Sequence, residues 1–243
     1  MSRLPCSGIR EVKAGPPEFP EFHSLYLLCF DKAMMIDPGP SNSVADLGFL
    51  DKLDYVFVTH PHPDHVGLLN EVVERFPQVQ VLVPPQSLDL FLYPEKLNSI
   101  FSVGELLQIF GPMEQVKANF REVKAGEEVD LGDRKARVIY SPGHDMRHIS
   151  LLLDEALFAG DSLGVRFNGV SIPTPWYDKE KFRDTVREAL SLRPRMVGIA
   201  HSGLVGLNHL NELLDWRTLD PDQLRIDGGS RDEVLRLYLG ING

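Results

Sequence analysis

The chain has 243 residues, 43% of them hydrophobic and 25% charged, which is enough to bury one large core and excludes a disordered composition. Its formal net charge is -10, and its lysines and arginines do not cluster, which argues against a nucleic-acid partner. No apolar run approaches the roughly 20 residues of a membrane span, and residues 1–15 lack the apolar core of a signal peptide. We therefore expect no membrane partner and a cytoplasmic location.

Short apolar runs alternate with amphipathic stretches in the first half of the chain. The runs predict strands at 23–30, 33–37, 55–59 and 79–84, and helices at 43–52 and 66–76. Cys29 lies inside the first run and is expected to be a buried free thiol, because two isolated cysteines make no disulfide framework. Residues 86–110 are apolar but less regular, and we interpret them as short helices that form a candidate flap or a homodimer contact.

Close-set strands separated by Gly and Asp turns follow from residue 120, and this pattern favours an antiparallel meander. Strands are expected at 120–125, 127–132, 134–141, 149–154, 156–160 and 196–200, and helices at 178–192 and 204–216. Residues 218–243 are interpreted as a C-terminal extension, with a polar loop and a short last helix. The chain 1–243 is thus predicted to be a single domain of α/β (α+β) class, with helices packed over sheets.

The segment His60-Pro61-His62-Pro63-Asp64-His65 places three imidazoles and a carboxylate within six residues, directly after an apolar strand. Imidazole nitrogen and carboxylate oxygen are ligands that suit zinc, iron and manganese. The two prolines stiffen the loop, so less conformational entropy is lost when the ligands are ordered. The segment therefore predicts a metal site at the end of this strand.

Three further ligand-type residues also follow apolar strands. His144 follows RVIYSPG, Asp161 follows ALFAG, and His201 follows MVGIA. Loops at strand ends are where sites are built, and we expect these side chains to meet the histidine segment. No CxxC pair occurs, which favours an open catalytic site over a closed structural zinc site.

These motifs, HPHPDH, SPGH, AGD and AHSG, resemble the ligand motifs of the metallo-β-lactamase superfamily, in its hydrolase branch. The order and rough spacing agree over residues 23–203, and Ile36 to Gly39, IDPG, is similar to the first motif of that family. The resemblance implies a four-layer αββα sandwich of two mixed β-sheets flanked by helices.

The resemblance also implies a role for each ligand. His60, His62 and His144 would hold a first metal ion, Asp64, His65 and His201 a second, and Asp161 would bridge the two. His148 resembles the second histidine of the family's GHxxGH segment, but the stretch here reads GHDMRH, with Arg147 in place of a small residue. We therefore expect His148, like Asp37, to support the ligands by hydrogen bonds.

The activity implied is that of a metal-dependent hydrolase with a metal-bridging hydroxide, since coordination lowers the pKa of water to about 7. Two divalent ions are expected, with zinc favoured and manganese or iron as alternatives, and Asp64 would orient the nucleophile or relay a proton. The favoured substrate is a small ester, thioester or lactone. A phosphodiesterase or nuclease, an iron-dependent oxidoreductase and a binding module without catalysis are the alternatives.

The segment 166–177 follows the predicted bridging aspartate and is a candidate wall of the substrate pocket. Arg166, Trp176 and Tyr177 are its candidate substrate-binding residues, and Tyr177 could donate a hydrogen bond to a leaving group. A surface aromatic that packs on the next helix is an equally good interpretation of Tyr177.

Overall fold

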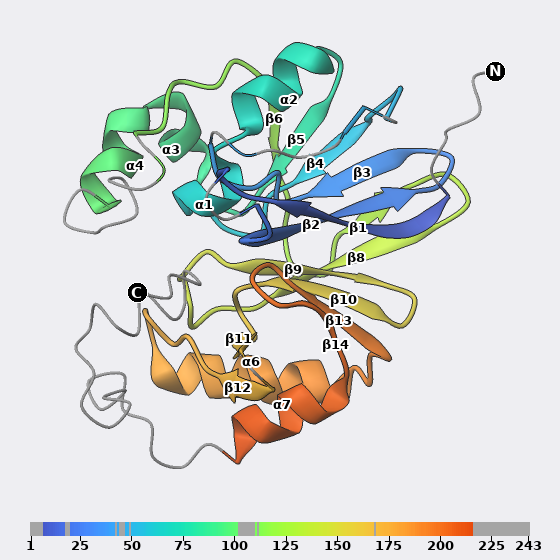
Figure 1. Cartoon of the computed structure of the whole chain (residues 1–243), viewed down its shortest axis with the longest axis vertical. Helices are drawn as coiled ribbons and strands as arrows, with labels where there is room; N and C mark the ends of the chain where they lie inside the picture. Colours follow the sequence, from blue (N-terminus) through green and yellow to red (C-terminus); the bar gives the residue numbers. More distant parts are fainter. Residues whose placement is uncertain are drawn as a thin grey trace.

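Apolar strands build two six-stranded sheets that lie face to face, and helices cover the outer face of each (Figure 1). The computed structural model describes residues 7–17, 20–41, 43, 47–48, 50–101, 110, 112–167 and 169–215. The arrangement is the expected αββα sandwich. In Figure 1, α2 (Leu69–Arg75), α3 (Leu88–Leu92) and α4 (Pro94–Phe101) lie above the first sheet, α1 (Pro63–Val66) lies near its left end, and α6 (Lys179–Ser191) and α7 (Leu207–Leu214) lie below the second sheet.

The first sheet has the strand order β1-β2-β3-β4-β5-β6. Its first three strands pair antiparallel, whereas β3 to β6 pair parallel and therefore need crossovers. The crossover from β4 to β5 carries α1 and α2, and the crossover from β5 to β6 carries α3 and α4. The strands are β1 (Gly8–Ala14), β2 (His23–Cys29), β3 (Ala33–Ile36), β4 (Tyr55–Phe57), β5 (Gln80–Val83) and β6 (Asn119–Glu122). The helices are α1 (Pro63–Val66), α2 (Leu69–Arg75), α3 (Leu88–Leu92) and α4 (Pro94–Phe101).

The second sheet has the order β14-β13-β10-β9-β8-β7 and contains the predicted antiparallel meander. Its strands are β7 (Glu128–Asp130), β8 (Lys135–Tyr140), β9 (Ile149–Leu153), β10 (Ala156–Gly160), β13 (Met196–Ile199) and β14 (Gly203–Val205). A separate hairpin joins β11 (Val165–Phe167) to β12 (Val170–Ile172), and α6 (Lys179–Ser191) and α7 (Leu207–Leu214) complete the layer. The one parallel pair, β10 with β13, is bridged by the crossover that includes α6.

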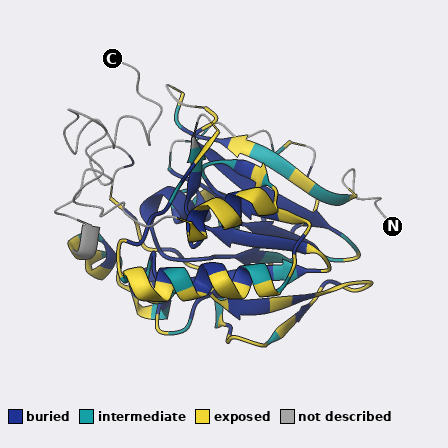
Figure 2. Cartoon of the chain, turned by 90° about the horizontal axis from the view of Figure 1, so that it is seen from below, coloured by how far each residue is buried: buried dark blue, intermediate teal, exposed yellow. Residues whose placement is uncertain are grey.

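Three apolar clusters correspond to the three interfaces between the four layers. The first packs α1 to α4 on the first sheet, the second lies between the sheets, and the third packs α6 and α7 on the second sheet. Figure 2 shows the burial pattern: the helices carry exposed residues on one face, and most of the strands beneath them are buried. Burying apolar area on both faces of each sheet is what holds the sandwich together.

Several local expectations are corrected. The helix expected at 66–76 begins only at Leu69 as α2, while Val66 ends α1, because the Leu68 N–H donates to the Gly39 carbonyl at 3.0 Å instead of to a carbonyl one helical turn before it. The helix expected from 204 begins at Leu207, because 203–205 pair with β13 as β14. The strands β1, β11 and β12 were not expected.

Cys29 is also corrected: it is buried but disulfide-bonded, so it is not a free thiol. The other cysteine of the chain, Cys6, lies outside the described residues.

Some predicted elements fall partly or wholly on residues that the structure does not describe. Residues 44–46 and 49 of the helix expected at 43–52, residues 102–109 of the candidate flap, and the extension 218–243 lie outside the described part. The described residues of the first of these segments, 43, 47–48 and 50–52, are not helical, so the helix expected there is wrong at these positions; the Leu50 N–H donates to the Leu47 carbonyl three residues back instead. Within the flap, α3 and α4 pack through Leu90, Phe91 and Leu97 into the first core cluster, so these side chains belong to the core. Among the described residues, no helix has both the length and the apolar character to cross a membrane.

Candidate metal centre

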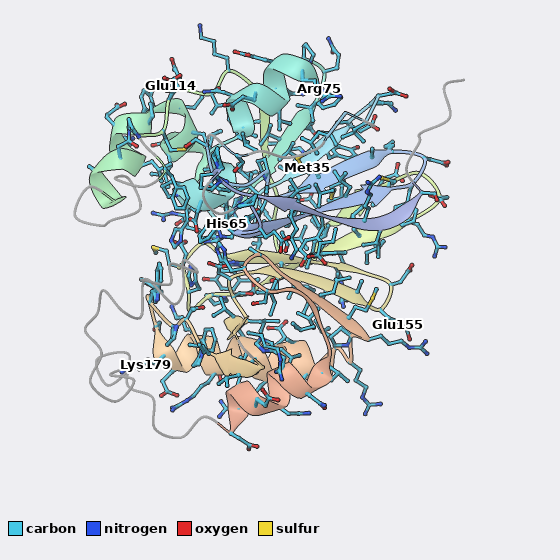
Figure 3. The ribbon with its side chains drawn as sticks, in the orientation of Figure 1. Met35, His65, Arg75, Glu114, Glu155 and Lys179 are labelled. Carbon is cyan, nitrogen blue, oxygen red and sulfur yellow. The ribbon has the colours of Figure 1, made fainter. Side chains whose placement is uncertain are left out.

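The ligand-type residues predicted from the sequence gather where the two sheets meet. The chain leaves β4 and enters the histidine segment, and α1 starts at Pro63, whose fixed φ suits the first turn of a helix. His144 lies between β8 and β9, Asp161 directly follows β10, and His201 lies between β13 and β14. Figure 3 shows His65, a residue of α1, at the boundary between the upper and lower layers.

Two groups of side chains have the spacing of metal ligands. In the first, His60, His62 and His144 each bring a ring nitrogen, and these atoms lie within 4.8 Å of one another. The second group brings together Asp64, His65, Asp161 and His201 within the same limit. All seven side chains are buried, with exposed fractions of at most 5%.

The Asp161 carboxylate lies between the two groups. Its Oδ2 is 3.4 Å from Nε2 of His65, 3.5 Å from Nε2 of His201 and 3.5 Å from Nε2 of His144. His144 belongs to the first group, whereas His65 and His201 belong to the second, so this oxygen is close to ligand-type atoms of both groups. The geometry thus places one carboxylate where both groups can share it.

The donor set fits divalent cations. His60 Nε2 and Asp64 Oδ1 are buried and have no hydrogen-bond partner among the described residues. Burying an unpaired polar atom costs free energy unless a ligand satisfies it, and nitrogen and oxygen donors of this kind suit zinc, manganese or iron. These atoms therefore point to cations as their partners.

Hydrogen bonds from outside the ligand groups hold several of the rings. Asp37 Oδ2 accepts from His65 Nδ1 at 2.9 Å and from the Thr59 hydroxyl at 2.7 Å, and Asp37 Oδ1 accepts from the Thr59 backbone at 2.8 Å. Thr59 Oγ1 lies 3.0 Å from His60 Nδ1. Asp37 is thus hydrogen-bonded to the histidine segment and to the strand end before it, and its left-handed backbone (φ 47) is one that Asp tolerates. That it supports metal ligands stays a prediction.

His148 stands behind the first group. Its ring stacks on His60 at a centroid distance of 4.6 Å, and its Nε2 accepts from the Asp161 backbone N–H at 3.3 Å. Nδ1 then carries the hydrogen and lies 3.1 Å from Ser141 Oγ. Both ring nitrogens of His148 are thus engaged in hydrogen bonds, and its supporting role stays a prediction.

In the second group, the carboxylates stabilise the protonated form of the imidazoles, and the protonated imidazoles stabilise the ionised form of the carboxylates. Burial lowers the pKa of His65, but the Asp161, Asp64 and Asp37 carboxylates outweigh it and raise that pKa well above its ordinary value. Burial also opposes the charge of His201, yet Asp161 and Asp64 raise its pKa to about 9. The imidazoles in turn hold the pKa of Asp64 and Asp161 below the ordinary range, against the effect of burial. Without a cation, this group would hold protons that a cation must displace.

The three candidate substrate residues differ in where they lie. Trp176 is 52% exposed as a residue, and its ring approaches the rings of His144 at 4.8 Å and His62 at 5.9 Å. Tyr177 is half-exposed, with the Lys181 ammonium 5.5 Å from its ring centre. Arg166 forms an ion pair with Glu212 of α7 at 2.7 Å and donates to Ser171. Of the three, Trp176 is the one that the structure brings against the candidate ligands.

Two supporting residues were missed in the sequence. Thr59 connects Asp37 to His60, and His23 lies beside His65 and His201. Little in the sequence indicated either residue, because a single threonine or histidine at the end of a strand is common in any fold.

Comparison with known proteins agrees with this geometry. The family model described as "Metallo-beta-lactamase superfamily" matches residues 20–201. A "metallo-beta-lactamase fold-containing protein" from Sulfurisphaera tokodaii, ST1585, is 40% identical over 98% of this chain and 96% of its own length. The crystal structure of ST1585 superposes with a TM-score of 0.85 over 98% of this chain and 97% of that one.

A more distant relative has an activity in its name. "Hydroxyacylglutathione hydrolase 1" of Vibrio vulnificus is 30% identical over 56% of this chain, and the match spans 46% of that protein's length. The match therefore covers about half of each protein.

Proposed function

Because this chain belongs to the metallo-beta-lactamase superfamily, we propose that it is a hydrolase that depends on two divalent metal ions and acts on a small ester, thioester or lactone. The observation that carries the proposal is the position of Asp161 Oδ2, within 3.5 Å of ring nitrogens from both ligand groups. The relatives named hydroxyacylglutathione hydrolases support hydrolysis of an acyl compound.

The proposed first cation would be held by His60, His62 and His144, and the second by Asp64, His65 and His201, with Asp161 shared. Zinc is the favoured metal, with manganese or iron as alternatives. When bound, two such cations lower the pKa of water toward about 7 and polarise the oxygen of the substrate.

Asp64 is the proposed catalytic residue. Its Oδ2 is 3.2 Å from His201 Nε2, while its buried Oδ1 has no hydrogen-bond partner in the described part of the chain. The lowered pKa keeps the carboxylate ionised at neutral pH, so Oδ1 can accept a hydrogen bond from a water molecule and orient it.

Aromatic side chains flank both ligand groups and favour an apolar acyl substrate. Trp176 lies against His144 and His62 on one side. On the other side Phe22 lies 4.6 Å from the His201 ring and 5.3 Å from Phe110. We propose that these rings line the path of a small-molecule substrate, since pockets of this kind are largely apolar.

The test begins with metal content. Purified protein is stripped, reloaded with zinc, manganese or iron, and assayed with a p-nitrophenyl ester, a thioester, a lactone and bis-p-nitrophenyl phosphate, with oxygen uptake measured on the iron form. We expect two equivalents of metal and turnover of at least one acyl substrate. His60→Ala and Asp161→Ala should lose metal and activity together while circular dichroism shows the fold retained.

Other results would redirect the proposal. Turnover confined to the phosphodiester would indicate a phosphodiesterase, and oxygen uptake without hydrolysis an oxidoreductase. A fully loaded protein that turns over none of these substrates would contradict catalysis, and full activity in both alanine variants would contradict the ligand assignment.

A further inference from the structure

His23, at the start of β2, is a histidine that the ligand assignment above leaves without a role. Its side chain is fully buried. Its ring lies edge-on to two of the proposed ligands, with centroid distances of 4.9 Å to His65 and 5.6 Å to His201. His23, His65 and His201 each bring a ring nitrogen, and these nitrogens lie within 4.8 Å of one another.

The hydrogen bonding of His23 follows the pattern of the proposed ligands. His144 and His201 each direct Nδ1 to a backbone carbonyl, that of Thr174 and that of Phe22, both at 3.0 Å. His23 does the same with its other nitrogen, since Nε2 lies 3.1 Å from the Asp37 carbonyl oxygen. Metal-bound histidines generally donate their second ring nitrogen in this way, which orients the ring.

The carbonyl contact settles which nitrogen of His23 carries the hydrogen. A carbonyl oxygen can only accept, so Nε2 is protonated and Nδ1 of the neutral ring has a free lone pair. This Nδ1 is buried and has no hydrogen-bond partner among the residues that the structure describes. A buried acceptor without a partner is costly, and a cation beside it would satisfy it.

We propose that His23 supplies a further nitrogen ligand, through Nδ1, to the cation held by Asp64, His65 and His201. The inference rests on the proposed two-metal function and assigns the second cation one more imidazole than the sequence motifs contain. The alternative is that His23 only holds the Asp37 carbonyl, and through it the segment that supports His65.

Two substitutions separate these roles. In His23→Gln the side-chain amide N–H₂ can still donate to the Asp37 carbonyl from the Nε2 position, but the Nδ1 lone pair is lost. In His23→Asn an oxygen stands near the Nδ1 position and the donor to Asp37 is lost. If His23 is a ligand, Gln should be the more damaging change, and if it only holds Asp37, Asn should be.

The measurement uses the full chain loaded with Co²⁺. Chelator competition gives the affinity of each equivalent, and proton NMR counts the exchangeable imidazole N–H signals that the paramagnetic ions shift. We expect His23→Gln to lose one shifted signal and to bind the second Co²⁺ about 10- to 100-fold more weakly. The affinity for the first Co²⁺ should be unchanged, which also reports that the variant is folded.

His209→Gln is the matched control. His209 is also buried and donates Nε2–H to a backbone carbonyl, that of Leu163 at 2.7 Å, but its Nδ1 is hydrogen-bonded to Ser171 Oγ at 2.8 Å. This variant should keep both Co²⁺ affinities and every shifted signal.

Unchanged signals and second-site affinity in His23→Gln would overturn the inference, as would a larger loss in Asn than in Gln, or a wild-type protein that binds a single Co²⁺. A different result would contradict the proposed hydrolase function without contradicting the role of His23. If wild type binds two ions and His23→Gln loses the second, but no substrate is hydrolysed, the ligand role stands and the hydrolase does not.

Discussion

At the scale of single residues, the Asp37 carboxylate contacts one of the proposed ligands directly and a second one through Thr59. It accepts hydrogen bonds from His65, from the Thr59 backbone and from the Thr59 hydroxyl, which in turn lies 3.0 Å from His60 Nδ1. The backbone carbonyl of Asp37 also accepts a hydrogen bond from His23 Nε2, at 3.1 Å. The tautomers and ring directions around the candidate centre therefore depend on a residue that is not itself an assigned ligand.

Asp37→Asn is expected to weaken metal binding about 10- to 100-fold, because the partner of His65 loses its charge and one of its acceptor oxygens. The substitution leaves the backbone undisturbed, since Asn also adopts positive φ readily. Competition with a chelator measures the effect, and Asp51→Asn at an exposed position is the control. Equal affinities in the two variants would show that Asp37 does not support the ligands.

The raised pKa values of His201 and His65 predict how the metal-free protein responds to pH. A histidine whose pKa is raised by folding stabilises the folded state below its unfolded pKa of about 6.5, and that contribution is lost as pH rises through the folded value, about 9 for His201. The free energy of unfolding of metal-free protein should therefore fall between pH 7 and 9.5. The expected slope is up to about 1.4 kcal/mol per pH unit for each proton.

Urea titrations across this pH range measure that slope. Protein loaded with metal should not show the fall, because bound cations have already displaced the protons. Metal-free protein that gains stability between pH 7 and 9.5 would contradict the charge arrangement of the second ligand group.

At the scale of elements, the loop that carries His144 is held by the start of α6. The Gly143 carbonyl accepts from the backbone of Tyr177 and Asp178, and Thr185 donates to the Pro142 carbonyl at 2.7 Å. Asp178 caps the helix by accepting from the Lys181 backbone. A helix far along the chain thus positions a ligand from the second sheet.

Gly143→Ala is expected to destabilise the protein by more than about 2 kcal/mol. Gly143 has φ +126, and a Cβ there would lie 2.4 Å from the Phe182 Cα, so backbone strain and a clash with α6 combine. Gly126→Ala is the control, since Gly126 also has positive φ (+83) but a Cβ there meets nothing within 4 Å. Urea unfolding should show a clearly smaller loss for the control, and similar losses would mean that the contact with α6 contributes nothing.

At the scale of the whole molecule, the candidate centre exists because the two sheets face one another. Tyr26 of the first sheet donates across the interface to the Ile199 carbonyl of the second at 2.9 Å, and its ring packs on Phe158 at 5.1 Å. The cluster between the sheets is buried, so separating them would expose it to water.

Phe158→Ala is expected to lower the free energy of unfolding by about 3–5 kcal/mol, because it leaves a cavity between the sheets. If both sheets unfold together, circular dichroism and tryptophan fluorescence should report one shared transition. Phe158→Leu, which fills more of the space, should lose less. A Phe158→Ala protein as stable as wild type would show that this interface does not hold the sandwich together.

The amino-acid sequence by itself determined the local parts of this protein. Apolar runs predicted β2 to β5, the meander from β7 to β10, and α6, because alternation and helical spacing are properties of neighbouring residues. The motifs also marked the seven ligands first assigned, though not His23, because each motif is a short stretch of neighbouring residues that can be read from the sequence alone. The break between α1 and α2 and the start of α7 were not visible, since a hydrogen bond from Leu68 to Gly39 and the pairing of β14 with β13 decide them.

Only the tertiary structure decided which atoms meet. It placed Asp161 between both ligand groups, paired Arg166 with Glu212, left Trp176 beside His144, and brought His23 against His65 and His201. Such contacts join residues up to 178 positions apart, as between His23 and His201, and depend on how two sheets pack. Packing is a cooperative property of the whole core, so no local stretch of sequence contains it.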